Sequence, residues 1–236
     1  IKISSGNGKR ITDQASQNGE TYSTNNYSFY AHHEEEKLNL LNESVYASAS
    51  GKEWYGESFK FTTERDFQFN IPNLINSESV DATVRLASRS IGVSNSFNIF
   101  ANGQSLFNMN VNGVDGNSES YFAFNQTGSK SFLSNSSNIT IRVKYNKPTS
   151  NAEGWLDYIT LNARSSLTFS SGQMSFRDKE SIGQAVTKFN LTASNATIWN
   201  VTNPTNVSNQ LFTSNGNALS FGANTTNLEE FIVFDN

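Results

Sequence analysis

Two pairs of side chains in this chain are of the types that carry out acid–base chemistry. Glu53 and Glu57 flank Trp54 and Tyr55, and two carboxylates beside an aromatic ring are the groups with which a glycosidase cleaves a sugar bond. A spacing of four residues on a strand or loop does not by itself make the two carboxylates face one bond. Packing of the two aromatic residues against a core or an adjoining domain is therefore the preferred interpretation.

The second pair is His32 and His33, the only imidazoles of the chain. Adjacent residues on a strand point to opposite faces, so the two rings are poorly placed to share a metal ion. The acidic run 34–36 that follows could attract a cation, but it also suits the first turn of a helix. We predict a helix from His33 to Asn42, no metal site and no cofactor.

The 236 residues include no cysteine. This excludes thiolate nucleophiles, disulfides, cysteine-based zinc sites and iron–sulfur clusters within the chain. Serine is frequent, but no Gly-x-Ser-x-Gly motif accompanies it. We therefore predict no catalytic residue.

The bulk composition narrows the class of protein. There are 17 basic and 21 acidic residues, a net charge of -4, and no run of Lys and Arg that could neutralise a row of phosphates. Mean hydropathy is -0.51 with no long apolar stretch, so we predict no nucleic-acid partner, no transmembrane segment and no secretory leader. Only 16% of residues are charged, Phe is frequent and most polarity comes from Asn, Ser and Thr, a composition typical of extracellular β-proteins.

Alternation of apolar and polar residues predicts antiparallel strands through the first two thirds of the chain. The runs are Phe67–Ile71, Val80–Leu86, Phe97–Phe100 and Ile139–Tyr145, with clusters of Gly, Asn and Pro between them. Short strands at this spacing are typical of a sandwich or jelly roll. We predict an all-β protein whose first domain, residues 1–165, is a jelly-roll sandwich of the galactose-binding-like type.

The pattern restarts after the apolar strand predicted for Leu156–Leu161. Further alternating runs occupy 174–176, 186–191, 197–201, 218–221 and 230–234. We predict a second domain at 166–236, a smaller β-sandwich or open barrel.

Three segments in order carry a resemblance to a known family. They are the glycine-bracketed aromatic stretch Gly51–Phe59, Trp155–Arg164 and Gln173–Arg177. Together they resemble the region ahead of the peptidase domain in PorU-type sortases of type IX secretion, which are gingipain-family cysteine peptidases.

The resemblance implies a non-catalytic region at the bacterial cell surface, associated with the outer membrane. In the family it precedes a Cys/His peptidase domain that removes C-terminal signals from secreted cargo and attaches the cargo to the surface. Its partners would be that peptidase domain in the same chain, secreted cargo, or other surface proteins of the secretion system. Catalytic positions would fall beyond Asn236. Trp54, Tyr55 and Phe59 are the residues we expect to contact an adjoining domain or a ligand, because large aromatics dominate such interfaces.

Two alternatives remain open. Ala101–Gly103 and Leu156–Ile159 also resemble galactose-binding-like jelly rolls, which implies a carbohydrate-binding β-sandwich module. The other alternative is a free-standing hydrolase that uses Glu53 and Glu57.

Overall fold

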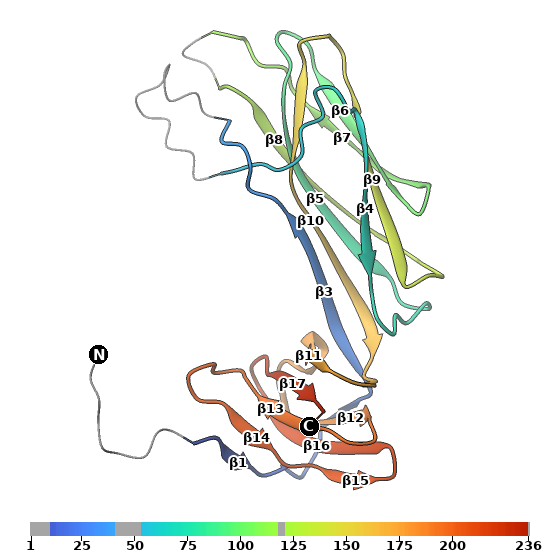
Figure 1. Cartoon of the computed structure of the whole chain (residues 1–236), viewed down its shortest axis with the longest axis vertical. Helices are drawn as coiled ribbons and strands as arrows, with labels where there is room; N and C mark the ends of the chain where they lie inside the picture. The colour runs from blue at the N-terminus through green and yellow to red at the C-terminus, as the bar shows by residue number, and fades with distance from the viewer. Residues whose placement is uncertain (1–9, 41–52, 118–120, 236) are drawn as a thin grey trace, which may run out of the picture. The chain divides into compact units, whose positions relative to one another are not determined.

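The structure is a computed structural model that describes residues 10–40, 53–117 and 121–235, and most of its regular structure is β-strand (Figure 1). A short 3-10 helix, η1 (Lys179–Ser181), separates β11 from β12. The strands are β1 (Thr12–Gln14), β2 (Tyr22–Thr24), β3 (Asn26–Glu34), β4 (Glu64–Asn70), β5 (Val80–Arg89), β6 (Asn95–Ala101), β7 (Gln104–Val111), β8 (Phe124–Phe132), β9 (Asn138–Asn146), β10 (Glu153–Ser166), β11 (Gln173–Arg177), β12 (Gln184–Thr192), β13 (Thr197–Asn200), β14 (Ser208–Gln210), β15 (Thr213–Asn215), β16 (Ala218–Thr225) and β17 (Glu230–Phe234).

The chain divides into two compact units, which we call the jelly-roll unit and the split unit. The jelly-roll unit is Tyr30–Ala163; the split unit combines the described residues up to Phe29 with those from Arg164 onward. Strands β3 and β10 run from one unit into the other. This division lies close to the predicted boundary at 165, but it assigns residues 10–29 to the unit that contains the C-terminal third.

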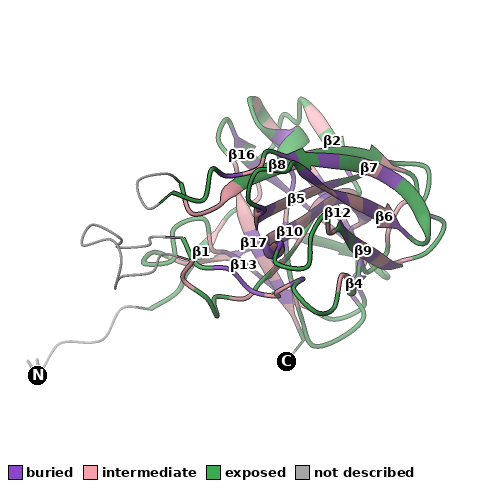
Figure 2. Ribbon diagram, turned by 90° about the horizontal axis from the view of Figure 1, so that it is seen from above, coloured by how far each residue is buried: buried purple, intermediate pink, exposed green. Residues whose placement is uncertain are grey.

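The jelly-roll unit consists of two four-stranded sheets with the orders β3-β10-β5-β8 and β4-β9-β6-β7. Numbered one to eight along the chain, these strands run 1-8-3-6 in one sheet and 2-7-4-5 in the other. That interleaving is the double Greek key of a jelly roll, as the sequence predicts. The four predicted alternating runs lie on β4, β5, β6 and β9, and the alternation of buried and exposed residues along the strands is visible in Figure 2.

The hairpin between β6 and β7 shows how turn residues set the register. Asn102 and Gly103 have φ angles of 49° and 80°, the left-handed values that a two-residue type I′ turn requires at both central positions. Ala101 pairs with Gln104 on either side of them. This Asn-Gly pair is one of the turn clusters that the sequence places between its alternating runs, and the structure confirms it as a turn.

Aromatic rings fill the space between the two sheets of the jelly-roll unit. Phe97 stacks on Tyr145 at 4.6 Å between ring centroids and meets Phe59 edge-on at 5.8 Å. Gly154 of β10 lies against this group, and a Cβ there would approach Phe97 Cζ to 2.6 Å. A glycine at this position lets the ring pack directly against the backbone of β10.

The split unit is also a pair of sheets, ordered β1-β14-β13-β17-β11 and β15-β16-β12-β2. Its core is built around four phenylalanines, Phe176, Phe189, Phe221 and Phe231, whose neighbouring rings lie 5.1–6.1 Å apart. Both N-terminal strands join by parallel pairing, β1 with β14 and β2 with β12. Each is only three residues long, so neither carries enough alternation to be predicted.

The helix predicted from His33 is wrong. Strand β3 continues to Glu34, and Leu38 then forms an antiparallel bridge with Tyr55. Backbone hydrogen bonds to Tyr55 thus replace those of a helix, an example of tertiary pairing that overrides a weak local preference. Residues 41 and 42 of that prediction lie outside the described part of the chain. Within the described residues, no helix is long and apolar enough to cross a membrane.

Candidate functional site

The three aromatic residues predicted as contacts lie in different environments. Tyr55 and Phe59 are buried, whereas Trp54 keeps 42% of its surface exposed. Tyr55 packs with Ala87 and Trp155 in a small apolar cluster. The contact with another domain or a ligand stays a prediction, and it depends chiefly on Trp54. Gly51 and Lys52, at the start of the motif, lie outside the described residues.

The segment that carries these aromatics is fixed by β10. Gly56 and Phe59 donate backbone hydrogen bonds to Leu156 and Gly154, at 2.8 and 2.7 Å, and Leu156 donates one to Glu57 at 3.0 Å. A Cβ on Gly56 would lie 2.8 Å from the backbone oxygen of Glu35. The glycine of the motif is therefore needed for close approach of two backbone segments.

A polar network lies beside this segment. Arg85 of β5 donates to Asp157 of β10 at 2.6 Å and to Glu53 at 2.7 Å. Tyr55 and Asn125 also donate to Glu53, at 3.2 and 3.4 Å. We call these five residues the Arg85 network. It connects three strands of one sheet, β5, β8 and β10, to the segment that contains the predicted motif.

A bulge in β10 places Asp157 in this network. Leu156 pairs with Leu86 and Tyr158 with Arg85, so Asp157 is an extra residue between two regular pairs. A bulge re-aims the side chain at which it occurs. The Asp157 side chain is only 5% exposed, which makes the Arg85 guanidinium its essential counter-charge.

The environment of the network shifts the pKa values of its acidic members and of Tyr55. Burial raises the pKa of Asp157, and the neighbouring Arg85 acts in the opposite direction. The hydrogen bond from Arg85 lowers the pKa of Glu53. Burial, together with the charge of Glu53, raises the pKa of Tyr55 to about 12. Glu53 is thus held ionised and Tyr55 protonated at neutral pH, an arrangement suited to bracing strands rather than to transferring protons.

Glu53 and Glu57 are held by separate partners. Glu53 belongs to the Arg85 network, whereas Glu57 Oε1 lies 2.8 Å from His33 Nε2. The His33 ring also packs on Phe67 of β4, 4.8 Å between centroids. Nothing in this arrangement directs the two carboxylates at a common bond.

His32 has different neighbours from His33. Its Nδ1 lies 3.1 Å from the Tyr30 hydroxyl, its Nε2 lies 2.7 Å from Glu34 Oε2, and its ring lies 5.8 Å from that of Tyr158. Within the described residues, no group of three or more His, Asp or Glu is arranged to hold a metal ion.

Sequence reasoning missed both the Arg85 network and the rings around His32. The alternation Tyr30-x-His32-x-Glu34 was a usable signal, because it places three polar or aromatic residues on one face of a strand. The incorrect helix at His33 obscured it.

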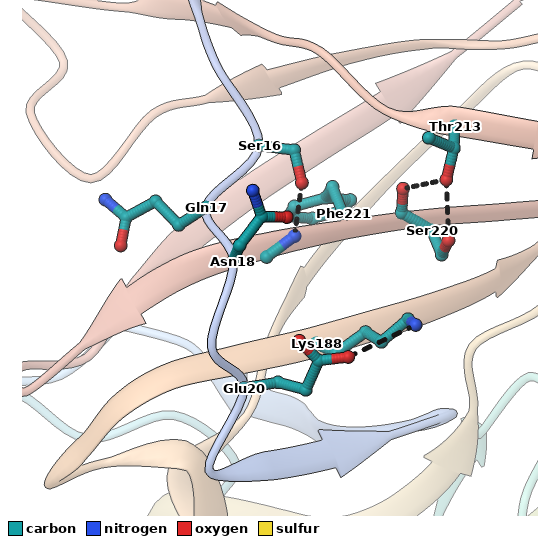
Figure 3. A pocket seen from close by; sticks show the side chains of 9 residues that line it. Ser16, Gln17, Asn18, Glu20, Lys188, Thr213, Ser220 and Phe221 are labelled. Carbon is teal, nitrogen blue, oxygen red and sulfur yellow. Dashed lines mark hydrogen bonds and ion pairs between the residues drawn. The ribbon is translucent and has the colours of Figure 1, made fainter.

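Each unit also contains a cavity. In the split unit, the segment 16–20 crosses strands β12 and β16 and borders an open pocket of about 230 Å³, with Lys188 and Glu20 paired at 3.4 Å (Figure 3). Gly222 allows this crossing, because a Cβ there would lie 2.2 Å from the Gln17 backbone oxygen. In the jelly-roll unit, a cavity of about 360 Å³ lies between the β6–β7 hairpin and residues 132–136. Neither cavity includes a predicted site residue.

Comparisons with known proteins bear on the fold. No protein-family model and no curated protein matches the chain. Among solved structures, it matches PorU from Porphyromonas gingivalis in a dimeric latent form, with a TM-score of 0.78 and 16% sequence identity. That match covers 96% of this chain and 22% of PorU.

Partial likenesses have much lower scores. One match is the insecticidal delta-endotoxin Cry8Ea1 from Bacillus thuringiensis, with a TM-score of 0.34 and 19% sequence identity. It covers 44% of this chain and 18% of the endotoxin. Another is a carbohydrate-binding module, CBM36, solved in complex with calcium and xylotriose, with a TM-score of 0.30 and 13% sequence identity. It covers 42% of this chain and 71% of the module. Over almost its whole length, therefore, this chain shares the fold of a region that makes up about a fifth of PorU.

Proposed function

We propose that this chain is a non-catalytic region of a PorU-like sortase at the bacterial cell surface. Its role would be to position a cysteine peptidase domain of the same protein, which removes C-terminal signals from secreted cargo and attaches the cargo to the surface. The observation that supports this most strongly is a fold match that covers 96% of the chain, both units included, with a TM-score of 0.78.

Two features of the residues support a role without chemistry. The chain has no cysteine, so it cannot supply the thiolate that such a peptidase needs. The carboxylates with the most suggestive spacing are engaged by Arg85 and His33. Both carboxylates therefore serve the folded structure, which agrees with a positioning role rather than a catalytic one.

Deletion within the longer protein tests this role. In a cell that makes the full-length protein, we would remove residues 1–236 and measure surface attachment of a cargo that carries a C-terminal signal. We expect the peptidase domain to accumulate while attachment falls. Full attachment without this region would refute the positioning role.

The exposed Trp54 offers a finer version of this experiment. Trp54→Ala removes a ring that is 42% exposed and is expected to lower attachment if it contacts the adjoining domain. Phe61→Ala is a matched control, since Phe61 is 92% exposed in the same unit and lies outside the predicted motif. Equal effects of the two substitutions would count against a specific contact at Trp54.

A further inference from the structure

Three rings gather on one face of the sheet β3-β10-β5-β8 in the jelly-roll unit. Tyr30 and His32 alternate along β3 and therefore project to the same side. Tyr158 lies on the adjacent strand β10, where the next residue, Ile159, is fully buried in the core. Tyr158 consequently projects to the side away from the core, 5.8 Å from His32 between centroids. We call Tyr30, His32 and Tyr158 the ring platform.

Tyr30 and His32 form a flat surface. Their planes differ by only 18°, with 6.0 Å between centroids, and the Tyr30 hydroxyl lies 3.1 Å from His32 Nδ1. A hydrogen bond to a ring nitrogen lies near the plane of that ring, so the two rings lie side by side rather than face to face. On the other side of the imidazole, Nε2 meets Glu34 at 2.7 Å. Both ring side chains keep accessible surface, with Tyr30 46% exposed and the His32 side chain 34%.

Rows of hydroxyl, amide and carboxylate groups continue from the platform across the sheet. Thr160 pairs with Thr83, whose hydroxyl lies 2.8 Å from that of Ser129 on β8. Two residues farther along, Asn162 pairs with Asp81, which accepts a hydrogen bond from Ser131 at 2.5 Å. Because strand residues two apart share a face, these rows lie on the same side as Tyr158.

The charges on this face restrict the ligand. Glu34 and Asp81 are acidic, and in the Arg85 network one guanidinium is shared by Glu53 and Asp157. Arg89, farther along the same face of β5, adds a second cation, which leaves four carboxylates to two guanidinium groups. Carboxylates therefore outnumber cationic groups, which disfavours phosphates, acidic polysaccharides and acidic peptides. Flat rings beside hydroxyl and amide groups suit a ligand with an apolar ring face and many neutral hydroxyls.

We propose that the ring platform of the jelly-roll unit binds a neutral polysaccharide. Sugar rings lie on Tyr30, His32 and Tyr158, and their hydroxyl groups exchange hydrogen bonds with Glu34 and with the polar rows that begin at Thr160. This binding does not depend on the positioning role proposed above.

Affinity electrophoresis tests the proposal. The 236-residue chain is run in native gels that each contain dextran, laminarin, xylan or galactomannan, with polygalacturonate as the acidic comparison. We expect retardation by at least one neutral polymer. Tyr30→Ala and Tyr158→Ala should each weaken that binding by roughly tenfold, equivalent to about 1.4 kcal/mol.

Matched variants make the result specific. Tyr30→Phe preserves the ring and is expected to retain most of the binding. Phe61→Ala removes an exposed ring that lies just before β4, a strand of the opposite sheet, and it should leave polysaccharide binding unchanged. Each variant is first checked for wild-type stability by its urea midpoint. If a variant is destabilised, His32→Ala is tested in its place.

Three results would overturn the proposal: no retardation in any neutral gel, retardation that persists in both Tyr→Ala variants, or stronger retardation by polygalacturonate than by every neutral polymer. None of them would alter the case for the positioning role.

Discussion

Among single residues, the charged side chains of the Arg85 network hold strands together. Arg85 donates hydrogen bonds to Asp157, whose side chain the β10 bulge directs into a buried position, and to Glu53, which precedes Trp54 in the aromatic segment. Removing one partner of a buried pair leaves the other charge without compensation. The Arg85 network should therefore matter more to stability than the exposed ion pairs of the same unit.

Arg85→Met tests this difference. We expect a loss of roughly 3–5 kcal/mol in the free energy of unfolding, because Asp157 stays buried without its counter-charge. Urea denaturation measures the change. Arg142→Met is the control, since Arg142 pairs with Asp66 and Glu64 on the surface and its loss should cost far less stability, because water screens an exposed ion pair. Equal losses in the two variants would show that Asp157 does not depend on Arg85.

The lowered pKa of Glu53 predicts a pH dependence with a definite sign. A carboxylate whose folded pKa is depressed contributes stability above its ordinary pKa and loses it as pH falls through the folded value. Arg85 is the main cause of the depression. We therefore expect Glu53→Gln to destabilise the protein at pH 7 and to do so much less at pH 3. Urea unfolding at both pH values measures this, and a deficit that is equal or larger at pH 3 would contradict the assignment.

The residue-level site was only partly predictable. The segment that contains Glu53, Trp54 and Tyr55 attracts attention through its aromatic and acidic residues, yet the sequence does not show that Tyr55 is buried and Trp54 exposed. Arg85 and Asp157 are 72 positions apart, and they meet only because of the register and the bulge between β5 and β10. Such a pairing cannot be inferred from local pattern.

At the scale of elements, the long strands were predictable and the short ones were not. Strands such as β5 and β9 bury alternate residues, so hydrophobic periodicity identifies them. In β1, by contrast, none of the three residues is fully buried. That strand forms because residues nearly two hundred positions away provide an edge to pair with.

Gly154 shows how one residue fixes the packing of β10. Gly154→Ala would place a Cβ 2.6 Å from Phe97 Cζ, in a core where Phe97 also contacts Phe59 and Tyr145. We expect a loss of about 1–3 kcal/mol from this overpacking, measured by urea unfolding.

A double-mutant cycle checks the physical cause. Phe97→Leu alone should also lower the free energy of unfolding. The double variant should lose less stability than the sum of the two single losses, because the smaller side chain makes room for the methyl group that Gly154→Ala adds. Strict additivity would mean that the two positions do not compete for space.

At the scale of the whole molecule, the N-terminal residues complete a sandwich formed otherwise by the C-terminal third. Strand β2 pairs with β12 along three residues, and Tyr27, which follows it, is only 3% exposed within that core. Removing residues 1–25 leaves β3 intact but deletes β1 and β2. We expect hydrogen-exchange protection in β12 and β14 to fall by roughly tenfold or more, about 1.4 kcal/mol of local stability.

The jelly-roll unit provides the internal reference for that truncation. Strands β6 and β9 pair with each other in a sheet of the jelly-roll unit, so the protection of their amides should change little. Unaltered protection in β12 and β14 would show that the N-terminal strands add nothing to the split unit.

The proposed positioning role implies that this chain serves a cysteine peptidase without performing the chemistry itself. The most direct measurement is to extend the reading frame beyond Asn236 and assay the full-length protein beside the 236-residue chain, on a peptide with a C-terminal sorting signal, with and without iodoacetamide. We predict that only the full-length protein cleaves the peptide and that alkylation abolishes cleavage, because this chain has no cysteine and cannot supply a thiolate. Cleavage by the 236-residue chain itself would refute its non-catalytic role, and full-length activity that survives alkylation would refute the cysteine peptidase.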